Sequence, residues 1–473
     1  MMNRRLLDRL SLSVLASLAV AGCATTAGET ELSTAPTAGE TEPSTATVES
    51  DTEQLTIWWQ DGFYPEEIDA LNNIIKDWEE DRSLTVDLTV IPQKDILQEV
   101  ERAIADGTQP DILYAGVGDI TIFPRLAWEG QLADVSDVIE PLSDRYAESA
   151  LAGVNYQNKQ REERNYYAVP LMQSAIHIHF WEDLLINRVG ERRDTIPKTW
   201  DTFWQFWVNA QSSLDQAEGT NIKSVGMPMS LSLDTYNNFE QFLEAYDVQV
   251  LDADGNLTLD TPEMRDAFVA ALADYANFYK LDTVPADATD WDNTGNNVSL
   301  LSRDSLMTVN HTLSAPGSQR NDEEIYYEKL STIKWPNKPT GEPMRFVIEI
   351  KQAVMFQNSD QPDTAKDFLS HLIQPDNLAA YTQGAQGRYL PVMPELFNDP
   401  FWQNPKDWHI EVALEQLENT RAAYQSINPA YGEVAAQNVW GNAMRKMALD
   451  NISPEQAADE AIQDIQRILT EWQ

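Results

Sequence analysis

Aromatic and carboxylate side chains stand together at two points early in this sequence, in a combination that suits a polyhydroxylated ligand. Trp59, Asp61 and Tyr64 come at or just after the end of one short apolar segment, and Asp119 follows another. Sugars have flat apolar ring faces and polar edges, so aromatic faces and carboxylate acceptors fit them together. Because Trp58 and Trp59 are neighbours in an extended segment, one of the two is expected to face the core.

The elements that must position these side chains follow from the hydrophobic pattern. Apolar residues alternate or run together in predicted strands, and recur at i, i+3 and i+4 in predicted helices. The predicted order is strand 55–59, helix 68–78, strand 84–91, helix 96–104, strand 111–117 and a helix that ends before Gly130. This order implies a parallel α/β sheet, which binds ligands beyond the carboxyl ends of its strands. Residues 59–66 and 116–120 lie at those ends.

Cys23 is the only cysteine of the chain and lies in the stretch LASLAVAGCATT. Positive residues precede a short apolar run, so we predict that residues 1–22 are a secretory signal peptide. The Ala-Gly-Cys stretch resembles the lipobox of bacterial lipoproteins, which implies cleavage before Cys23 and attachment of lipid to its sulfur. The alternative is an ordinary signal peptide with an incidental cysteine. With lipid attached, the protein would be exported and anchored to a membrane on its periplasmic side.

Residues 23–52 and the overall charge describe the surroundings of the folded body. The direct repeat TAGETELSTAP and TAGETEPSTAT has almost no large apolar residue, so we predict a disordered tether. The net charge of −43 disfavours nucleic acid and anionic ligands. It suits a saline environment, where salt screens the self-repulsion.

Three other motifs have structural interpretations. A stripe of large apolar residues at helical spacing predicts a core-facing helix: Trp200, Phe203, Trp204, Trp207 and Val208. His177 and His179 share one face of a predicted strand but have no clear third ligand nearby, so we expect no metal. The segment DADGNLTLD at 252–260 has its glycine at the wrong position for a calcium loop and predicts a hairpin turn.

Several stretches, in order, resemble the extracellular solute-binding proteins of carbohydrate ABC importers, the maltose-binding-protein class. They run over nearly the whole of 54–473 and read QPDILYAGVGDITIFPRLAWEGQLADVSDVI, YAVPLMQSAIHIHFWEDLL, IPKTWDTFWQF, SLLSRDSLMTVNHTLSAPG, AVMFQNSDQPDTAKDFLSHLIQPDNLAAYTQGAQGRYLPV and ISPEQAADEAIQDIQRIL. The resemblance implies a two-lobed α/β periplasmic-binding-protein fold with a central ligand cleft and crossover hinge strands. It implies lobe one at 53–173 plus 353–398 and lobe two at 174–350 plus 400–473.

The resemblance also implies a set of ligand-binding residues. They are Trp59, Asp61, Tyr64, Asp119, Gln173, Ser174, Tyr236, Asn237, Asp290, Trp291, Asp292, Glu349, Gly387 and Arg388. Glu349 stands where the family often has a glycine-rich run, so a side chain replaces bare backbone there. Arg388 can donate two hydrogen bonds to neighbouring hydroxyl groups.

The function implied is that of a monomeric importer subunit, without catalytic residues or cofactors, that delivers its ligand to ABC permease subunits. The charge and the aromatic loops favour a small neutral polyol with one or two rings. The resemblance extends to the branch of the family that takes up compatible solutes, which implies glucosylglycerol first and trehalose or sucrose next. A malto-oligosaccharide is the alternative within the family. An exported glycoside hydrolase and a surface adhesin are the alternatives outside it, although no nucleophile elbow or phosphate-binding loop occurs in the sequence.

Overall fold

The computed structural model describes residues 54–216 and 221–472. The signal peptide, Cys23 and the tether predicted at 23–52 lie outside the described residues. The strands are β1 (Gln54–Gln60), β2 (Thr85–Ile91), β3 (Ile112–Tyr114), β4 (Asn155–Asn158), β5 (Glu163–Tyr166), β6 (Val169–Ser174), β7 (His177–Trp181), β8 (Lys223–Gly226), β9 (Ser305–Asn310), β10 (Leu330–Ile333), β11 (Phe346–Met355), β12 (Leu390–Pro391) and β13 (Thr420–Ala422).

The helices vary from single turns to long amphipathic segments. The α-helices are α1 (Pro65–Arg82), α2 (Gln93–Asp106), α3 (Phe123–Trp128), α4 (Ser136–Ile139), α5 (Glu148–Ala152), α6 (Glu182–Leu184), α7 (Trp200–Asp215), α8 (Leu233–Ala245), α9 (Pro262–Lys280), α10 (Gly295–Leu301), α11 (Ser314–Gly317), α12 (Pro362–Leu372), α13 (Pro375–Gly384), α14 (Trp408–Gln416), α15 (Tyr431–Ala436), α16 (Val439–Arg445) and α17 (Pro454–Glu471). Among the described residues, none of these helices has the length and apolar character needed to cross a membrane.

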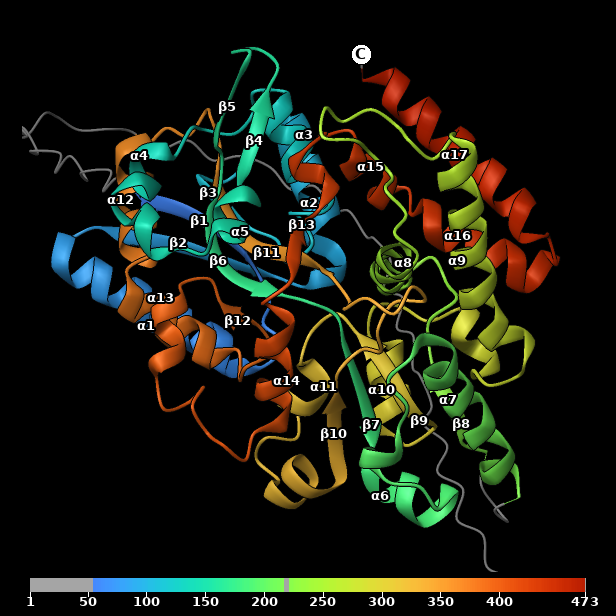
Figure 1. Ribbon diagram of the computed structural model, residues 1–473. Coiled ribbons are helices and arrows are strands. Elements are labelled where there is room, and N and C mark those ends of the chain that lie inside the picture. Colours follow the sequence, from blue (N-terminus) through green and yellow to red (C-terminus); the bar gives the residue numbers. More distant parts are fainter. Residues whose placement is uncertain (1–53, 217–220, 473) are drawn as a thin grey trace, which may run out of the picture. The chain divides into compact units, whose positions relative to one another are not determined.

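The first sheet has the strand order β12-β6-β11-β3-β1-β2, with β13 paired to β11 (Figure 1). Strand β1 is parallel to β2 and to β3, which confirms the parallel arrangement predicted for the N-terminal segments. Strand β11 comes from much later in the chain and runs antiparallel to both β3 and β6. The loops after β1 and β3 therefore open at the same edge of this sheet.

The second sheet has the order β10-β7-β9-β8. The chain enters it directly after β6, because only two residues separate β6 from β7, and it returns to the first sheet through β11. Helix α7 packs on β8 of this sheet. Its apolar stripe is buried as predicted: Trp200, Phe203, Trp204 and Trp207 are buried, and Val208 packs on the same core.

The segment 252–260 forms the predicted turn. Leu251 and Leu257 pair as an antiparallel bridge across it. Gly255 has φ +81°, a left-handed conformation that favours glycine, and a side chain there would press on Asn428. The loop is therefore held by the backbone bridge between Leu251 and Leu257 and packs against Asn428.

Candidate functional site

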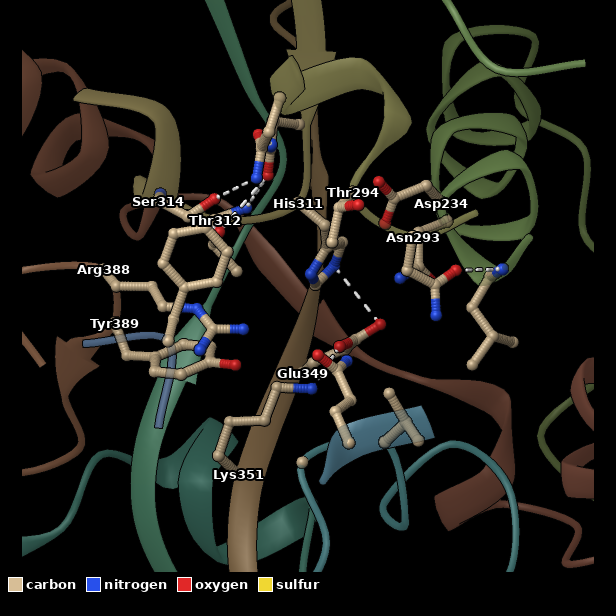
Figure 2. Close-up of a pocket in the computed structure, with 18 residues that line it drawn as sticks. Asp234, Asn293, Thr294, His311, Thr312, Ser314, Glu349, Lys351, Arg388 and Tyr389 are labelled. Atoms are coloured by element: carbon tan, nitrogen blue, oxygen red, sulfur yellow. Dashed lines mark hydrogen bonds and ion pairs between the residues drawn. The ribbon is translucent and has the colours of Figure 1, made fainter. Parts of the chain in front are cut away.

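A small cavity of about 60 Å³ lies where loops of the two sheets meet (Figure 2). Its walls come from the loops after β1 and β3, from strand β11, from the turn before β12, and from the segments around α8, α10 and the end of β9. The lining residues are Phe63, Gln93, Gly116, Val117, Leu233, Asp234, Asn237, Asn293, Thr294, Asn297, Asn310, His311, Thr312, Ser314, Glu349, Lys351, Arg388 and Tyr389. Small-molecule sites usually measure roughly 300–1,000 Å³, so the two walls must separate before a ligand can enter.

Strand β11 carries a buried charge network along one wall. Lys351 Nζ lies 2.5 Å from Glu349 Oε2 and 3.2 Å from Asp119 Oδ2. Burial opposes the charge of Lys351, but Asp119 and Glu349 outweigh it and raise the pKa of the lysine. Burial raises the pKa of Asp119 to about 7 despite the nearby lysine. Lys351 is thus held as a cation by two carboxylates, of which Asp119 is the more easily protonated.

His311 joins this network from the opposite wall. Its Nε2 lies 3.3 Å from Glu349 Oε1, and its Nδ1 lies 3.3 Å from Ser174 Oγ. Burial lowers the pKa of His311 to about 4, so the ring is neutral at pH 7 and can donate from Nε2 to the carboxylate. Burial alone would raise the pKa of Glu349, but His311 and Lys351 outweigh it and hold that pKa below its usual value. Glu349 is therefore a buried anion on the wall of the cavity that β11 forms.

Arg388, in the turn before β12, lies between two aromatic rings and lines the same cavity. Its guanidinium carbon is 5.0 Å from the Phe63 ring centroid and 4.6 Å from that of Tyr389. Glu67 is its carboxylate partner, at 3.7 Å from Nη1. Its buried Nε has no hydrogen-bond partner among the described residues. The side chain is held between these groups, and its buried Nε is left with an unused donor.

Gly387 explains how the turn can bring Arg388 to this position. The residue has φ +74°, and a Cβ there would come within 2.9 Å of the Arg320 guanidinium. A larger residue would therefore strain the turn and collide with its neighbour.

The opposite wall consists mainly of amide and hydroxyl groups. Asn297 Nδ2 donates to Ser314 Oγ at 3.0 Å, and Asn310 Nδ2 donates to Asn297 Oδ1. Asn310 Oδ1 in turn accepts from the backbone N–H of Thr312 at 2.9 Å. Amides tied to each other in this way keep fixed orientations, and each retains hydrogen-bonding capacity for hydroxyl groups. Asp234 stands beside them, with a pKa raised by burial and by the charge of Glu349.

The structure brings some of the residues predicted from the sequence to this cavity. Asn237, Glu349 and Arg388 line it. Behind the lining, Asp119 contacts Lys351, Ser174 contacts His311, and Tyr64 Oη donates to the backbone oxygen of Ser314 at 2.7 Å. These residues support the cavity through their contacts with its walls.

Other predicted residues do not line the cavity. Trp59 is fully buried, stacks on Tyr114 at 4.6 Å between ring centroids, and does not line the cavity. Asp61 Oδ1 accepts from the first N–H of helix α2, at Gln93, and Gln173 Nε2 donates to the backbone oxygen of Pro391. The remaining ones lie beside the cavity or in the turn before α10: Tyr236, Asp290, Trp291 and Asp292.

Sequence reasoning missed several lining residues. Lys351 is two residues from Glu349 on the same strand, so period-two alternation could have placed both side chains on one face. Tyr389 follows Arg388 directly and could have been added as its stacking partner. His311 and Asp234 gave no local signal, because their position depends on how α8 packs against β9 and β11.

His179 and His409 are bonded to protein groups, whereas Nδ1 of the buried His177 has no hydrogen-bond partner among the described residues. His179 Nδ1 lies 2.8 Å from Thr332 Oγ1, and that hydroxyl also contacts His409 Nδ1. No group of three or more His, Cys, Asp or Glu side chains in the described part of the chain could hold a metal ion.

Comparison of the whole fold with solved structures defines the class of protein. A solute-binding protein of an ABC transporter from Thermotoga lettingae, bound with α-D-tagatose, superposes with a TM-score of 0.73 at 19% identity, covering 88% of this chain and 99% of that one. Maltose-bound MalE3 of T. maritima gives 0.70 at 19% identity, with the same coverage of both chains. The GacH receptor of Streptomyces glaucescens gives 0.70 at 14% identity and covers 89% of this chain and 100% of that one. The chain therefore has the two-lobed α/β fold of periplasmic binding proteins.

The sequence then identifies the family. The model of the bacterial extracellular solute-binding proteins matches residues 73–411, which is more than half of the chain, and the chain belongs to that family. A binding protein of Brucella abortus (strain 2308) is 24% identical over 401 residues, which cover 82% of this chain and 87% of that protein. The family consists of binding proteins, which supports at family level the prediction that the chain is not an enzyme.

Proposed function

We propose that this protein captures a small neutral glycoside outside the cytoplasm and delivers it to the permease subunits of an ABC importer. Glucosylglycerol is the first candidate ligand, and trehalose or sucrose is the next. The lobes are proposed to comprise 53–173 with 353–398 and 174–350 with 400–473. The observation that carries the proposal is the cavity between the two sheets, whose lining is dominated by amides, hydroxyls and two aromatic rings.

The chemistry of the lining supports a polyol without a net charge. Asn293, Asn297 and Thr294 offer both donors and acceptors, as a ring of hydroxyl groups requires. The Phe63 and Tyr389 rings offer flat apolar faces for a sugar ring. Lys351 is already neutralised by two carboxylates, so it offers little attraction to an anionic ligand.

A malto-oligosaccharide is the second candidate. The similarity of the fold to maltose-bound MalE3 favours it, as does the likeness to a binding protein for cyclic α-maltosyl-1,6-maltose from Arthrobacter globiformis. The presence of two aromatic faces in the cavity favours the shorter ligand, because a longer chain needs more platforms.

Calorimetry with purified residues 53–473 tests the ligand class. Saturable heat with glucosylglycerol, trehalose or sucrose is the expected result. Arg388→Ala should weaken that binding by about 1–3 kcal/mol, because it removes a donor from desolvated hydroxyl groups. Arg303→Ala is the matched control, since Arg303 lies over the Trp181 ring and lines no part of this cavity. Binding of maltotriose alone would overturn the osmolyte assignment, and release of sugar products would overturn the binding-protein assignment.

We also propose that lipid on Cys23 anchors the protein to a membrane. The lipobox-like stretch supports this proposal, and the tether at 23–52 would then hold the body near the permease. Cys23→Ser should release the protein from membranes and leave ligand affinity unchanged. Incorporation of labelled palmitate that persists in Cys23→Ser would contradict the anchor.

A further inference from the structure

We propose that a groove between helices α3 and α17 is a second carbohydrate-binding site, for neutral oligosaccharides. The groove has a volume of about 690 Å³ and shares no lining residue with the cavity described above. Its walls are the ends of α3 and α17, Lys159 after β4, and the acidic loop at 254–260. The proposal does not depend on which ligand the cleft binds.

Two tryptophans form the apolar part of the groove. The Trp128 and Trp472 ring centroids are 6.4 Å apart, and their planes are inclined by 36°. Both side chains are half-buried, so each keeps part of its ring open to the groove. Neither indole N–H has a hydrogen-bond partner among the described residues, and both donors remain available. Tilted aromatic platforms with free donors at their edges match a sugar ring and its hydroxyl groups.

Acceptors stand along the other side of the groove. The carboxylates of Asp254 and Asp260 are exposed, and neither makes an ion pair or hydrogen bond with another described residue. The side-chain amide of Gln466, on α17, is free in the same sense. These groups can accept hydrogen bonds from hydroxyls and donate one through the amide.

The acidic loop is rigid before any ligand arrives. Asp252 Oδ1 accepts from the backbone N–H groups of Asp254 and Asn256, at 2.9 and 2.8 Å. Asn428 Nδ2 donates to the Gly255 oxygen at 3.0 Å and fastens the loop to the next wall. Groups that are already in place lose little conformational freedom on binding, which favours measurable affinity.

The combination selects neutral sugars over other ligands. Two unpaired carboxylates against one lysine disfavour anionic sugars and nucleic acid. The acidic loop alone is not a metal site, because no group of three or more His, Cys, Asp or Glu side chains among the described residues could hold a metal ion. Lys159 Nζ lies 5.4 Å from the Trp128 ring centroid and, being exposed, can move aside or donate to a hydroxyl. The volume falls in the usual range of small-molecule sites, roughly 300–1,000 Å³.

Fluorine NMR of the full chain with 5-fluorotryptophan tests the proposal. Cys23→Ser keeps the protein free of lipid, and Arg388→Ala with Asn297→Ala disables the cleft. The probes are maltotriose and cellotriose, added separately at millimolar concentrations. The Trp128 and Trp472 resonances are assigned from Trp→Phe variants. The expected result is a saturable shift of these two resonances with either probe, in the cleft-disabled protein.

Two variants define the site further. Trp472→Ala should weaken the saturable binding at least tenfold, and Trp408→Ala, which removes an exposed tryptophan outside both cavities, should leave it unchanged. If Trp472→Ala does not fold, the double variant Asp254→Ala with Asp260→Ala, which changes only exposed side chains, should weaken binding by a similar factor. Resonances of Trp128 and Trp472 that do not respond to either probe would overturn the proposal. The proposal would also be overturned if the Trp472→Ala variant or the double aspartate variant bound the probes as tightly as the parent does. None of these outcomes depends on whether the cleft itself binds sugar, so failure of this proposal and failure of the proposed function can be told apart.

Discussion

The two walls of the cleft are built from different kinds of side chain, charged on one wall and mostly neutral on the other. The wall built on β11 and the turn before β12 carries Glu349, Lys351 and Arg388, each already paired with a charge or enclosed by aromatic rings. The wall around α10 and the end of β9 carries neutral groups such as Asn297 and Asn310, linked by their own hydrogen bonds. The first wall is fixed by electrostatics, and the second is fixed by amide geometry.

This difference indicates a division of roles. Buried charges are expensive to separate, so the β11 wall is expected to contribute chiefly to stability and to the shape of the floor. Neutral amides and hydroxyls can exchange partners with water or sugar at little cost, so the opposite wall is expected to contribute chiefly to recognition. The contacts that join the walls include those of His311 with Glu349 and of Tyr64 with Ser314, and a hydrogen bond from the backbone N–H of Leu313 to the Arg388 oxygen.

Removal of Lys351 should have the largest effect on stability. Lys351→Met leaves Glu349 and Asp119 buried without their cation, and breaking such a pair costs about 3–5 kcal/mol. Urea unfolding at pH 7 measures the loss. Asp119→Asn is the matched control, because burial already raises the pKa of Asp119 to about 7 and its neutral form is accessible in the native protein. If the two variants lose equal stability, the lysine is not the centre of the network.

The burial of His311 should give the protein a distinct acid sensitivity, because it lowers the pKa of the ring although Glu349 acts in the opposite direction. The pKa of His311 is about 4 in the folded protein against an ordinary value of 6.5, so the unfolded chain binds a proton first as the pH falls. The stabilisation from the neutral ring is complete above pH 6.5 and is lost as the pH falls towards 4. At pH 5 the loss is about 2 kcal/mol.

A comparison with His311→Gln isolates this effect. Asp119 acts with the opposite sign between its ordinary pKa and about 7, because the folded protein favours its protonated form, but it is present in both proteins. The stability difference between parent and variant should therefore shrink by about 2 kcal/mol from pH 7 to pH 5. A difference that does not change with pH would show that His311 does not titrate as its buried position requires.

The sequence was sufficient to predict the local elements. The period-two and period-3.6 patterns between residues 54 and 130 predicted β1, α1, β2, α2 and β3 in order and in parallel pairing, because each buries one face against neighbours close in the chain. The insertion of β11 between β3 and β6 could not be derived from such patterns, since it joins segments more than 170 residues apart.

The site was predicted less completely, for the same reason. Arg388 and Glu349 were found through the resemblance to a family. Trp59 was chosen because it ends a strand at the binding edge, yet its indole N–H donates to Tyr381 Oη at 2.9 Å inside the core. A strand gives its residues two possible faces, and only the packing of α13 against α1 and β6 decides which face is buried.

Tyr64 should show the smallest effect, and the effect should appear in binding rather than in folding. Its hydroxyl crosses from the loop after β1 to the Ser314 oxygen, at 2.7 Å, in the narrow state of the cleft. When the walls separate, water can satisfy both groups, so Tyr64→Phe removes a bond only from the narrow state. The expected loss of affinity is about 0.5–1.5 kcal/mol, or roughly two- to tenfold, with little change in urea unfolding of the unliganded protein. Tyr327→Phe is the control, because Tyr327 accepts from Asn404 Nδ2 at 3.0 Å away from the cavity. Calorimetry of both variants with the ligand that the parent binds decides the matter: equal affinity of Tyr64→Phe and parent would mean that this bond does not hold the two walls together.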